Sequence, residues 1–152
     1  MIKGLGVDII GVERFSQALA RRRGRLVRRL FTPSEAASCG GSAERLAGRF
    51  AAKEAFYKAL GTGLREFTWQ DVEVKNNELG APRLLFSPRL AAYLQEKGVC
   101  RSHISISHDR EFALAQVILE AGPEMALDAK VASAWEETTQ DSSVNKDMGV
   151  ER

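Results

Sequence analysis

The chain has 152 residues and a mass of 16.7 kDa; 44% of the residues are hydrophobic, 28% are charged, and the formal net charge is +2. This size and composition fit one globular domain and exclude disordered, collagen-like and low-complexity chains. No apolar run approaches the roughly 20 residues of a membrane span, Asp8 breaks the N-terminal apolar segment too early for a secretory signal, and two cysteines are too few for a disulfide framework, so we expect a cytoplasmic protein without membrane contact.

Residues 2–10 alternate as a strand does. One face would carry Leu5, Val7 and Ile9, and the other Gly4, Gly6 and Asp8. Glycines in a strand often mark the close approach of a ligand or another backbone. A carboxylate inside an apolar run needs a cation, a metal or several hydrogen bonds. Asp8 is therefore a candidate ligand residue, with capping of the following helix as the alternative.

Residues 11–30 have a helical apolar pattern, interrupted at Gly24. Six arginines fall within the nine residues 21–29, which is typical of a solvated helix face or of a surface for an acidic protein or nucleic acid. No aromatic residue lies between these arginines and no nucleic-acid motif is present, so we expect no nucleic-acid partner.

A short helix is predicted to begin at Thr32-Pro33 and to end at Gly40, followed by the strongest helix, 43–60. This long helix places Glu54 and Lys58 in one stripe with Leu46 and Phe50. Taken alone, the two charged residues form a surface ion pair. In line with apolar residues, they could instead provide a carboxylate for Mg²⁺ beside a lysine for phosphate.

The second half of the domain is mixed. Strands are predicted at 69–75 and 83–86 around a turn, a helix at 88–97, and strands at 103–107 and 111–120. The strand 111–120 is apolar on both faces, as a covered central strand would be. The expected fold class is α+β, with an antiparallel sheet packed against one long helix.

His108 follows a strand within Ser107-His108-Asp109. Three consecutive residues cannot orient one another as a catalytic triad does, so a phosphate contact or a structural role is expected for this histidine. A zinc site drawn from Cys100, His103, Cys39 and His108 would have incomplete spacing.

Gly122-Pro123 marks a boundary between a domain, 1–121, and a C-terminal extension, 122–152. Residues 1–120 carry 19 Lys and Arg against 13 Asp and Glu, whereas residues 121–152 carry 3 against 7. Leu127, Val131 and Trp135 recur at four-residue spacing, which predicts an amphipathic helix at 123–137, and disorder is expected from Thr138. The extension either docks on the basic domain or a neighbouring subunit, or is an appended mobile segment.

Three segments together resemble the signatures of holo-acyl-carrier-protein synthases, the short bacterial class of 4′-phosphopantetheinyl transferases. They are Gly4-Leu-Gly-Val-Asp8-Ile-Ile, Arg49-Phe-Ala-Ala-Lys-Glu54-Ala-Phe-Tyr-Lys58-Ala-Leu-Gly-Thr-Gly63 and Ser105-Ile-Ser-His108. The resemblance implies transfer of the phosphopantetheine group of coenzyme A to a serine of apo acyl carrier protein, with release of adenosine 3′,5′-bisphosphate. It also implies Mg²⁺ dependence and a homotrimer with active sites between neighbouring subunits.

The resemblance assigns roles to the matched residues. Asp8 and Glu54 would bind the metal, and Lys58 would neutralise charge on the pyrophosphate. His108 would contact a phosphate or assist proton transfer. As cationic neighbours, Arg49 and Lys53 are available to the phosphates of coenzyme A. Either Glu54 or a metal-activated water could be the base for the serine.

Acyl carrier proteins are acidic, so the resemblance implies that the arginines of this chain bind the carrier protein. Those expected to bind the carrier protein are Arg14, Arg21, Arg22, Arg25, Arg28 and Arg29. The alternative function is a non-catalytic basic module that binds an acidic protein or nucleic acid through residues 14–29. That alternative leaves Asp8, Glu54 and Lys58 without a role.

Overall fold

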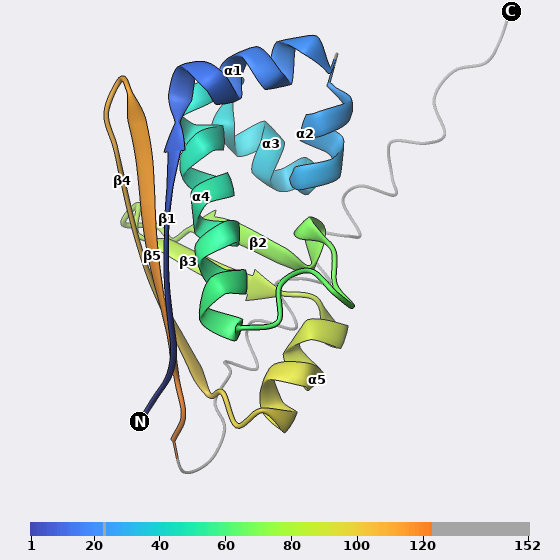
Figure 1. The fold of residues 1–152 in the computed structure, drawn as a ribbon, viewed down its shortest axis with the longest axis vertical. Helices are drawn as coiled ribbons and strands as arrows, with labels where there is room; N and C mark the ends of the chain where they lie inside the picture. Colours follow the sequence, from blue (N-terminus) through green and yellow to red (C-terminus); the bar gives the residue numbers. More distant parts are fainter. Residues whose placement is uncertain (23, 123–152) are drawn as a thin grey trace, which may run out of the picture.

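The computed structural model describes residues 1–22 and 24–122. Three antiparallel strands form its main sheet, in the order β1 (Ile2–Gly11), β5 (Phe112–Glu120), β4 (Arg101–His108), and the long helix α4 (Ala43–Leu60) packs against one face of that sheet (Figure 1). The expected α+β class, with one long helix on an antiparallel sheet, is confirmed. The helix expected at 123–137 and the disorder expected from Thr138 lie outside the described residues.

The helices begin and end where capping residues predict. The segment 11–30 divides at Gly24, whose φ of 77° is left-handed, into α1 (Val12–Arg21) and α2 (Arg25–Leu30). Thr32 and Glu35 form a reciprocal capping box that starts α3 (Pro33–Cys39). The helix α4 matches its predicted bounds because Ser42 caps its first turn and Gly61, at φ 76°, ends it. Gly11, and not Asp8, precedes α1 at the cap position, so the capping alternative for Asp8 is wrong.

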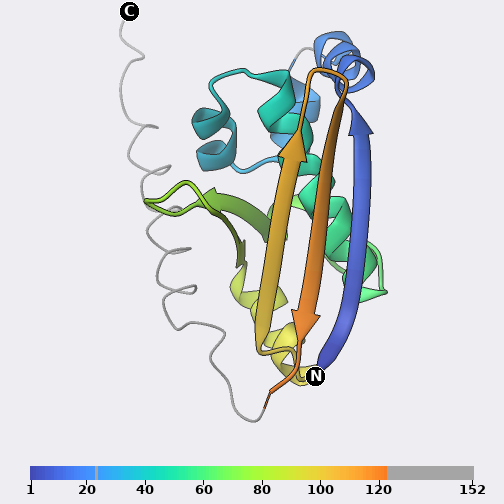
Figure 2. The ribbon, with the colours of Figure 1, turned by 90° about the vertical axis from the view of Figure 1, so that its left-hand side faces the viewer.

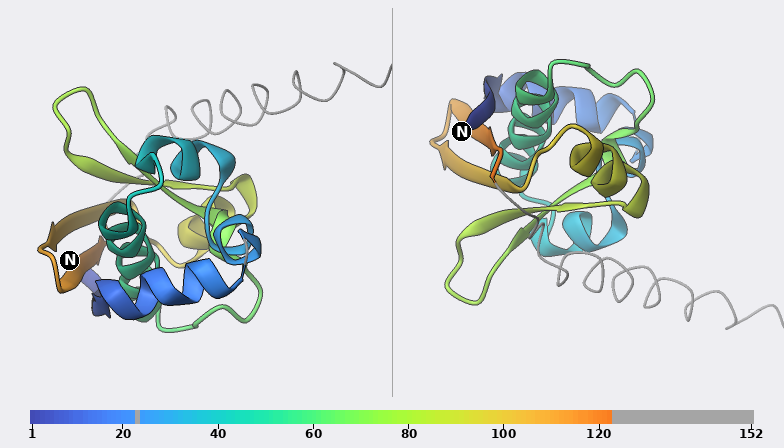
Figure 3. Two further views of the ribbon diagram at one scale, coloured as in Figure 1. Left: turned by 90° about the horizontal axis from the view of Figure 1, so that it is seen from above. Right: turned by 90° about the horizontal axis from the view of Figure 1, so that it is seen from below.

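The middle of the chain forms a second, smaller sheet. Residues predicted as the start of a strand form a 3₁₀ turn, η1 (Trp69–Asp71), because Asp71 accepts hydrogen bonds from the Thr68 amide and hydroxyl and closes the turn. The strands β2 (Val72–Asn76) and β3 (Pro82–Phe86) then pair with each other, and α5 (Pro88–Glu96) follows. Figure 3 shows the tip of this hairpin projecting beyond the rest of the domain. The described chain contains no helix that is long and apolar enough to cross a membrane.

The glycines of β1 let the strand lie directly on the backbone of α4. A Cβ atom added at Gly4 would lie 1.9 Å from the Ala59 carbonyl oxygen, and one added at Gly6 would lie 1.9 Å from that of Ala55. The predicted close approach is thus made by another backbone. Asp8 lies on the same face of β1 and is carried toward α4 with the glycines.

The opposite face of the main sheet, turned toward the viewer in Figure 2, carries exposed apolar side chains in the described part of the chain. Leu5 is 56% exposed and Ile9 is 59% exposed, and Val7, Phe112 and Leu114 extend the same surface. The strand β5 is central, as predicted, but α4 covers only the face that carries Ala113, Ala115, Val117 and Leu119. Within the described part of the chain, nothing buries the second apolar face of β5, so the expectation that this strand is covered on both faces stays a prediction about neighbouring subunits.

Lys53 is buried in the core, and this corrects its expected role in binding coenzyme A. Its side chain has 0% exposure, and its ammonium donates to Glu35 at 2.6 Å and to the carbonyls of Leu30 at 2.7 Å and Trp69 at 2.9 Å. Burial raises the pKa of Glu35 and lowers that of Lys53, while each partner opposes the shift of the other. All three donors of the ammonium are used to hold α2, α3 and η1 on α4, so none is left for a phosphate.

The contact between β1 and α4 gives the first prediction. Replacing Gly6 by Ala should lower the free energy of unfolding by at least about 2 kcal/mol, because the new methyl group would overlap a helix carbonyl. Gly11→Ala is the matched control, since the nearest atom to its added Cβ is Arg14 Cβ at 4.0 Å. Urea unfolding at one protein concentration measures both. Equal stability of the two variants would contradict the close backbone contact.

The buried ion pair of Lys53 and Glu35 gives the second prediction. Lys53→Met should cost about 3–5 kcal/mol at pH 8, because it leaves the Glu35 carboxylate buried without its cation. Burial raises the folded-state pKa of Glu35, so stability is lost as pH rises through that pKa, and the cost should shrink at pH 5. Lys53→Met combined with Glu35→Gln should recover part of the loss at pH 8. A cost that does not change with pH would show that Glu35 is not its source.

Candidate functional site

The first cluster of functional side chains lies between β1 and α4. Lys58 donates to the Asp8 carboxylate at 2.6 Å and to the Val7 carbonyl at 3.3 Å. Lys58 and Glu54 stand one helical turn apart on α4, so both reach the same side of the helix. The side chain of Asp8 is 13% exposed and that of Lys58 54% exposed, so the cluster lies at the surface with the carboxylate beneath the ammonium.

The electrostatics of this cluster favour a bound cation. Burial raises the pKa of Glu54, the nearby Asp8 carboxylate raises it further, and Lys58 opposes both effects. The hydrogen bond to Asp8 raises the pKa of Lys58, which keeps the ammonium charged. The second carboxylate oxygen of Asp8 is buried and accepts no hydrogen bond from the described residues. Two carboxylates that repel each other, one with an orphaned oxygen, fit a hard divalent cation such as Mg²⁺.

The described residues contain no group of three or more metal-binding side chains. Mg²⁺ is usually held by one or two carboxylates together with substrate phosphates and water. Asp8 and Glu54 are the two carboxylates that could hold such a cation together with oxygen atoms of a phosphorylated substrate.

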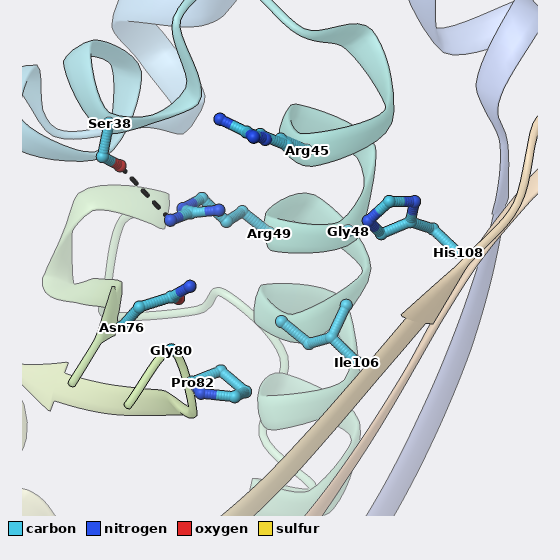
Figure 4. Close-up of a pocket in the computed structure, with 9 residues that line it drawn as sticks. All are labelled: Ser38, Arg45, Gly48, Arg49, Asn76, Gly80, Pro82, Ile106 and His108. Carbon is cyan, nitrogen blue, oxygen red and sulfur yellow. Dashed lines mark hydrogen bonds between the residues drawn. The ribbon is translucent and has the colours of Figure 1, made fainter. Parts of the chain in front are cut away.

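A second cluster lines a cavity of about 380 Å³ between α3, α4, the hairpin β2–β3 and β4 (Figure 4). Its cationic or titratable side chains are Arg45, Arg49 and His108. Arg49 donates to the Ser38 hydroxyl at 3.2 Å, and the Nε atom of Arg49 is buried without an acceptor among the described residues. In Figure 4 both arginines extend from α4, and His108 lies beside the helix near Gly48. Cationic donors around an open cavity make this a candidate anion site.

The two clusters lie on opposite sides of α4. Arg45 and Glu54 are nine positions apart, as are Arg49 and Lys58, and nine residues make about two and a half helical turns. The sheet repeats this separation, because Asp8 pairs with Ala115, which pairs in turn with Ile106, and His108 lies two residues beyond Ile106 on β4. The strands β1 and β4 are therefore about 10 Å apart, with β5 between them.

The predicted site residues thus separate into two sets. Asp8, Glu54 and Lys58 come together as expected, whereas Arg49 and His108 belong to the other cluster and Lys53 to neither. Sequence reasoning missed Arg45, although it lies one turn before Arg49 on the same face of the helix. It also missed Gly48, where an added Cβ would lie 3.1 Å from the Ile106 side chain, which would have to shift.

The residues of the possible Ser-His-Asp triad and of the possible zinc site are held apart or have other partners in the structure. Asp109 accepts hydrogen bonds from the amides of Glu111 and Phe112 and so closes the β4–β5 turn, without a bond to His108. His103 pairs with Glu120 at 2.9 Å. Cys39 and Cys100 are buried free thiols. Neither a triad nor a zinc site forms from these described residues.

The expected carrier-binding arginines are exposed. They are Arg14 and Arg21 on α1, Arg22 after it, and Arg25, Arg28 and Arg29 on α2. None of them forms an ion pair with an acidic side chain within residues 1–22 and 24–122. We call these six residues the arginine face. It begins on the helix that directly continues β1, a few residues after Asp8.

Comparison with known proteins finds similar sequences and structures. The profile of the 4′-phosphopantetheinyl transferase superfamily matches residues 4–117. A holo-[acyl-carrier-protein] synthase of Trichlorobacter lovleyi is 46% identical over 125 residues, which cover 80% of this chain and 99% of the relative. The one from Geobacter metallireducens is 47% identical over 124 residues, covering 79% of this chain and 98% of the relative.

Solved structures show the same fold. The crystal structure of holo-[acyl-carrier-protein] synthase from Neisseria meningitidis has a TM-score of 0.75 and 34% identity, and covers 79% of this chain and 99% of its own. The Helicobacter pylori enzyme in complex with coenzyme A has a TM-score of 0.71 and 31% identity, covering 76% and 99%. On the matched residues and the shared fold, this chain belongs to the 4′-phosphopantetheinyl transferase superfamily.

Proposed function

We propose that the protein transfers the 4′-phosphopantetheine group of coenzyme A to a serine of apo acyl carrier protein, releases adenosine 3′,5′-bisphosphate and depends on Mg²⁺. The observation that carries this proposal is the Asp8–Lys58 contact of 2.6 Å, with an orphaned Asp8 oxygen beside Glu54. The relatives named holo-[acyl-carrier-protein] synthase, and the Helicobacter pylori structure that holds coenzyme A, support the choice of substrates.

The cluster on β1 and α4 would hold the reacting pyrophosphate. Asp8 and Glu54 would bind Mg²⁺, which supplies positive charge to the pyrophosphate oxygens when bound. Lys58 keeps its ammonium charged and half exposed, so it can donate to the same oxygens as negative charge builds up on the leaving phosphate. Its present bond to Asp8 holds it at the edge of the site.

The cavity on the other side of α4 would hold the rest of the nucleotide. Arg45, Arg49 and His108 provide donors for the phosphates of the adenosine 3′,5′-bisphosphate portion. The Ser38 hydroxyl donates to the Glu35 carbonyl at 2.9 Å while it accepts from Arg49, which fixes the guanidinium against α3. Arg49 therefore needs little reorganisation to receive an anion.

The reaction follows from these positions. The serine oxygen of the carrier protein attacks the phosphorus that bears the pantetheine arm, and the bond from that phosphorus to the bridging oxygen of adenosine 3′,5′-bisphosphate breaks. Two groups can accept the serine proton: the Glu54 carboxylate and a water molecule in the site. Lys58 neutralises charge on the departing phosphate.

We further propose a homotrimer with the site at the seam between subunits. One chain holds its two clusters on opposite sides of α4, so the cavity of one copy has to face the Asp8 cluster of another for a single coenzyme A to touch both. The open apolar face of the sheet, with Leu5, Val7, Ile9, Phe112 and Leu114 exposed, supports the proposal, because contiguous exposed apolar surface often marks a protein–protein contact. A heterologous contact of this kind closes into a ring.

The arginine face would bind the acidic carrier protein. Rim charges of this kind act mainly on encounter rate and are screened by salt, whereas the phosphates of coenzyme A are held in a more enclosed site.

We also place the protein in the reducing cytoplasm, an assignment supported by its two buried free thiols. The domain boundary near residue 121 is supported by the relatives, which match about 80% of the chain.

The test is the mass of apo acyl carrier protein after incubation with coenzyme A, Mg²⁺ and the protein. A gain equal to the phosphopantetheine group is expected, and no gain would favour the non-catalytic basic module.

Asp8→Ala and Glu54→Ala should each slow transfer by at least about 100-fold while the protein stays folded. Glu13→Ala, which removes an exposed carboxylate bound only to Gln17, is the control and should keep its rate. Near wild-type turnover of either site variant at saturating Mg²⁺ would remove that residue as a metal ligand.

A further inference from the structure

A partly apolar groove lies next to the arginine face. It has a volume of about 390 Å³ and is lined by Arg28, Arg29, Leu64, Phe67, Thr68, Trp69 and Gln70, and we call it the α2 groove. Gln70 donates to the carbonyls of Arg28 and, at 2.9 Å, Phe31. These hydrogen bonds fix α2 against η1, and both elements line the groove. A groove with aromatic walls and a cationic rim suits a ligand that is both acidic and apolar.

The cations around the groove have no acidic partner in the described part of the chain. The nearest carboxylate on α1, that of Glu13, accepts a hydrogen bond from Gln17. The clustered arginines repel one another, and a bound acidic segment would reduce this electrostatic repulsion.

The chain itself carries a segment with matching chemistry. Residues 123–152 contain seven acidic residues against three basic ones. The apolar residues Leu127, Val131 and Trp135 are interspersed with these acids. The relatives lack a counterpart, because the matches reach 97–100% of their lengths but only about 80% of this chain. The acidic segment is thus an addition to a domain that otherwise follows its family.

The segment is long enough to reach the groove from its point of attachment. It follows Gly122, just after β5 ends, and in Figure 1 that end of β5 lies at the opposite end of the domain from α1 and α2. Trp135 is the thirteenth residue after Gly122, and thirteen residues in an extended chain span up to about 45 Å, against a domain diameter of about 35 Å. A tethered ligand also acts at an effective concentration of up to about 1 mM, so weak contacts suffice.

We propose that residues 123–152 bind the α2 groove and the arginine face as an internal acidic ligand. The acidic side chains pair with the arginines, and Trp135 enters the groove. Resting on the proposed function, this makes the segment a competitor of the acyl carrier protein for the same surface, and it leaves the coenzyme A site untouched.

The kinetic test uses the full chain. Glu136→Gln with Glu137→Gln should lower the KM for apo acyl carrier protein about 3–10-fold at low salt and leave the KM for coenzyme A unchanged. The difference should vanish near 0.5 M NaCl, where the Debye length falls below about 5 Å. The matched control is Glu78→Gln with Glu96→Gln, which neutralises two exposed acids of the domain and should give no such gain. Equal KM values for the two double variants would overturn the proposal.

A second measurement does not depend on catalysis. The chain has two tryptophans, Trp69 in the groove and Trp135 in the segment, so the emission of the full chain minus that of Trp135→Phe reports the segment and leaves the lining of the groove intact. Docking predicts an emission maximum blue-shifted from that of a peptide of residues 123–152, with the shift lost in high salt or after Arg21→Ala with Arg25→Ala. Emission identical to the peptide under all conditions would refute docking. A salt-sensitive blue shift in a protein without transferase activity would support docking and refute the proposed function.

Discussion

The contact between the backbone of β1 and the backbone of α4 positions everything else in the site. Gly4 and Gly6 carry no Cβ, so the strand meets the helix carbonyls of Ala59 and Ala55 without side chains between them. Asp8 follows on the same face, reaches Lys58 at 2.6 Å and lies near enough to Glu54 to add to the rise in the pKa of Glu54 that burial causes. With ordinary side chains at the two glycines, helix and strand would stand farther apart and the three charged groups would not form one cluster.

The helix α4 distributes its charges in three directions, and each direction has a different use. Glu54 and Lys58 face β1, Arg45 and Arg49 face the cavity on the far side, and Lys53 points into the core, where Glu35 and two carbonyls hold it. The buried pair fixes the shorter helices on α4, and through Ser38 the same region orients Arg49. A catalytic cluster, an anion cavity and a structural ion pair therefore depend on one helix.

The sequence predicts the elements well because their ends are local signals, such as the Thr32 capping box and the left-handed Gly61. The resemblance to holo-acyl-carrier-protein synthases predicts the Asp8 cluster, whereas the residues alone mark a close approach at Gly4 and Gly6 and a shared stripe for Glu54 and Lys58. Sequence reasoning fails for Lys53, since the partner that buries it, Glu35, comes from another helix and no local pattern links them. Helical periodicity alone predicts that Arg49 and Lys58, nine residues apart, lie on opposite sides of α4.

Mixing inactive variants tests most directly the claim that two copies complete each site. Asp8→Ala disables one half, and Arg45→Ala with His108→Ala disables the other, so each protein alone should be inactive. After subunit exchange of equal amounts, about a quarter of the sites should combine two intact halves, and about a quarter of wild-type activity should return in an assembly of trimer mass by light scattering. Asp8→Ala mixed with Glu54→Ala damages the same half twice and should recover nothing. Activity that stays at the sum of the separate variants in the first mixture would show that one chain builds its site alone.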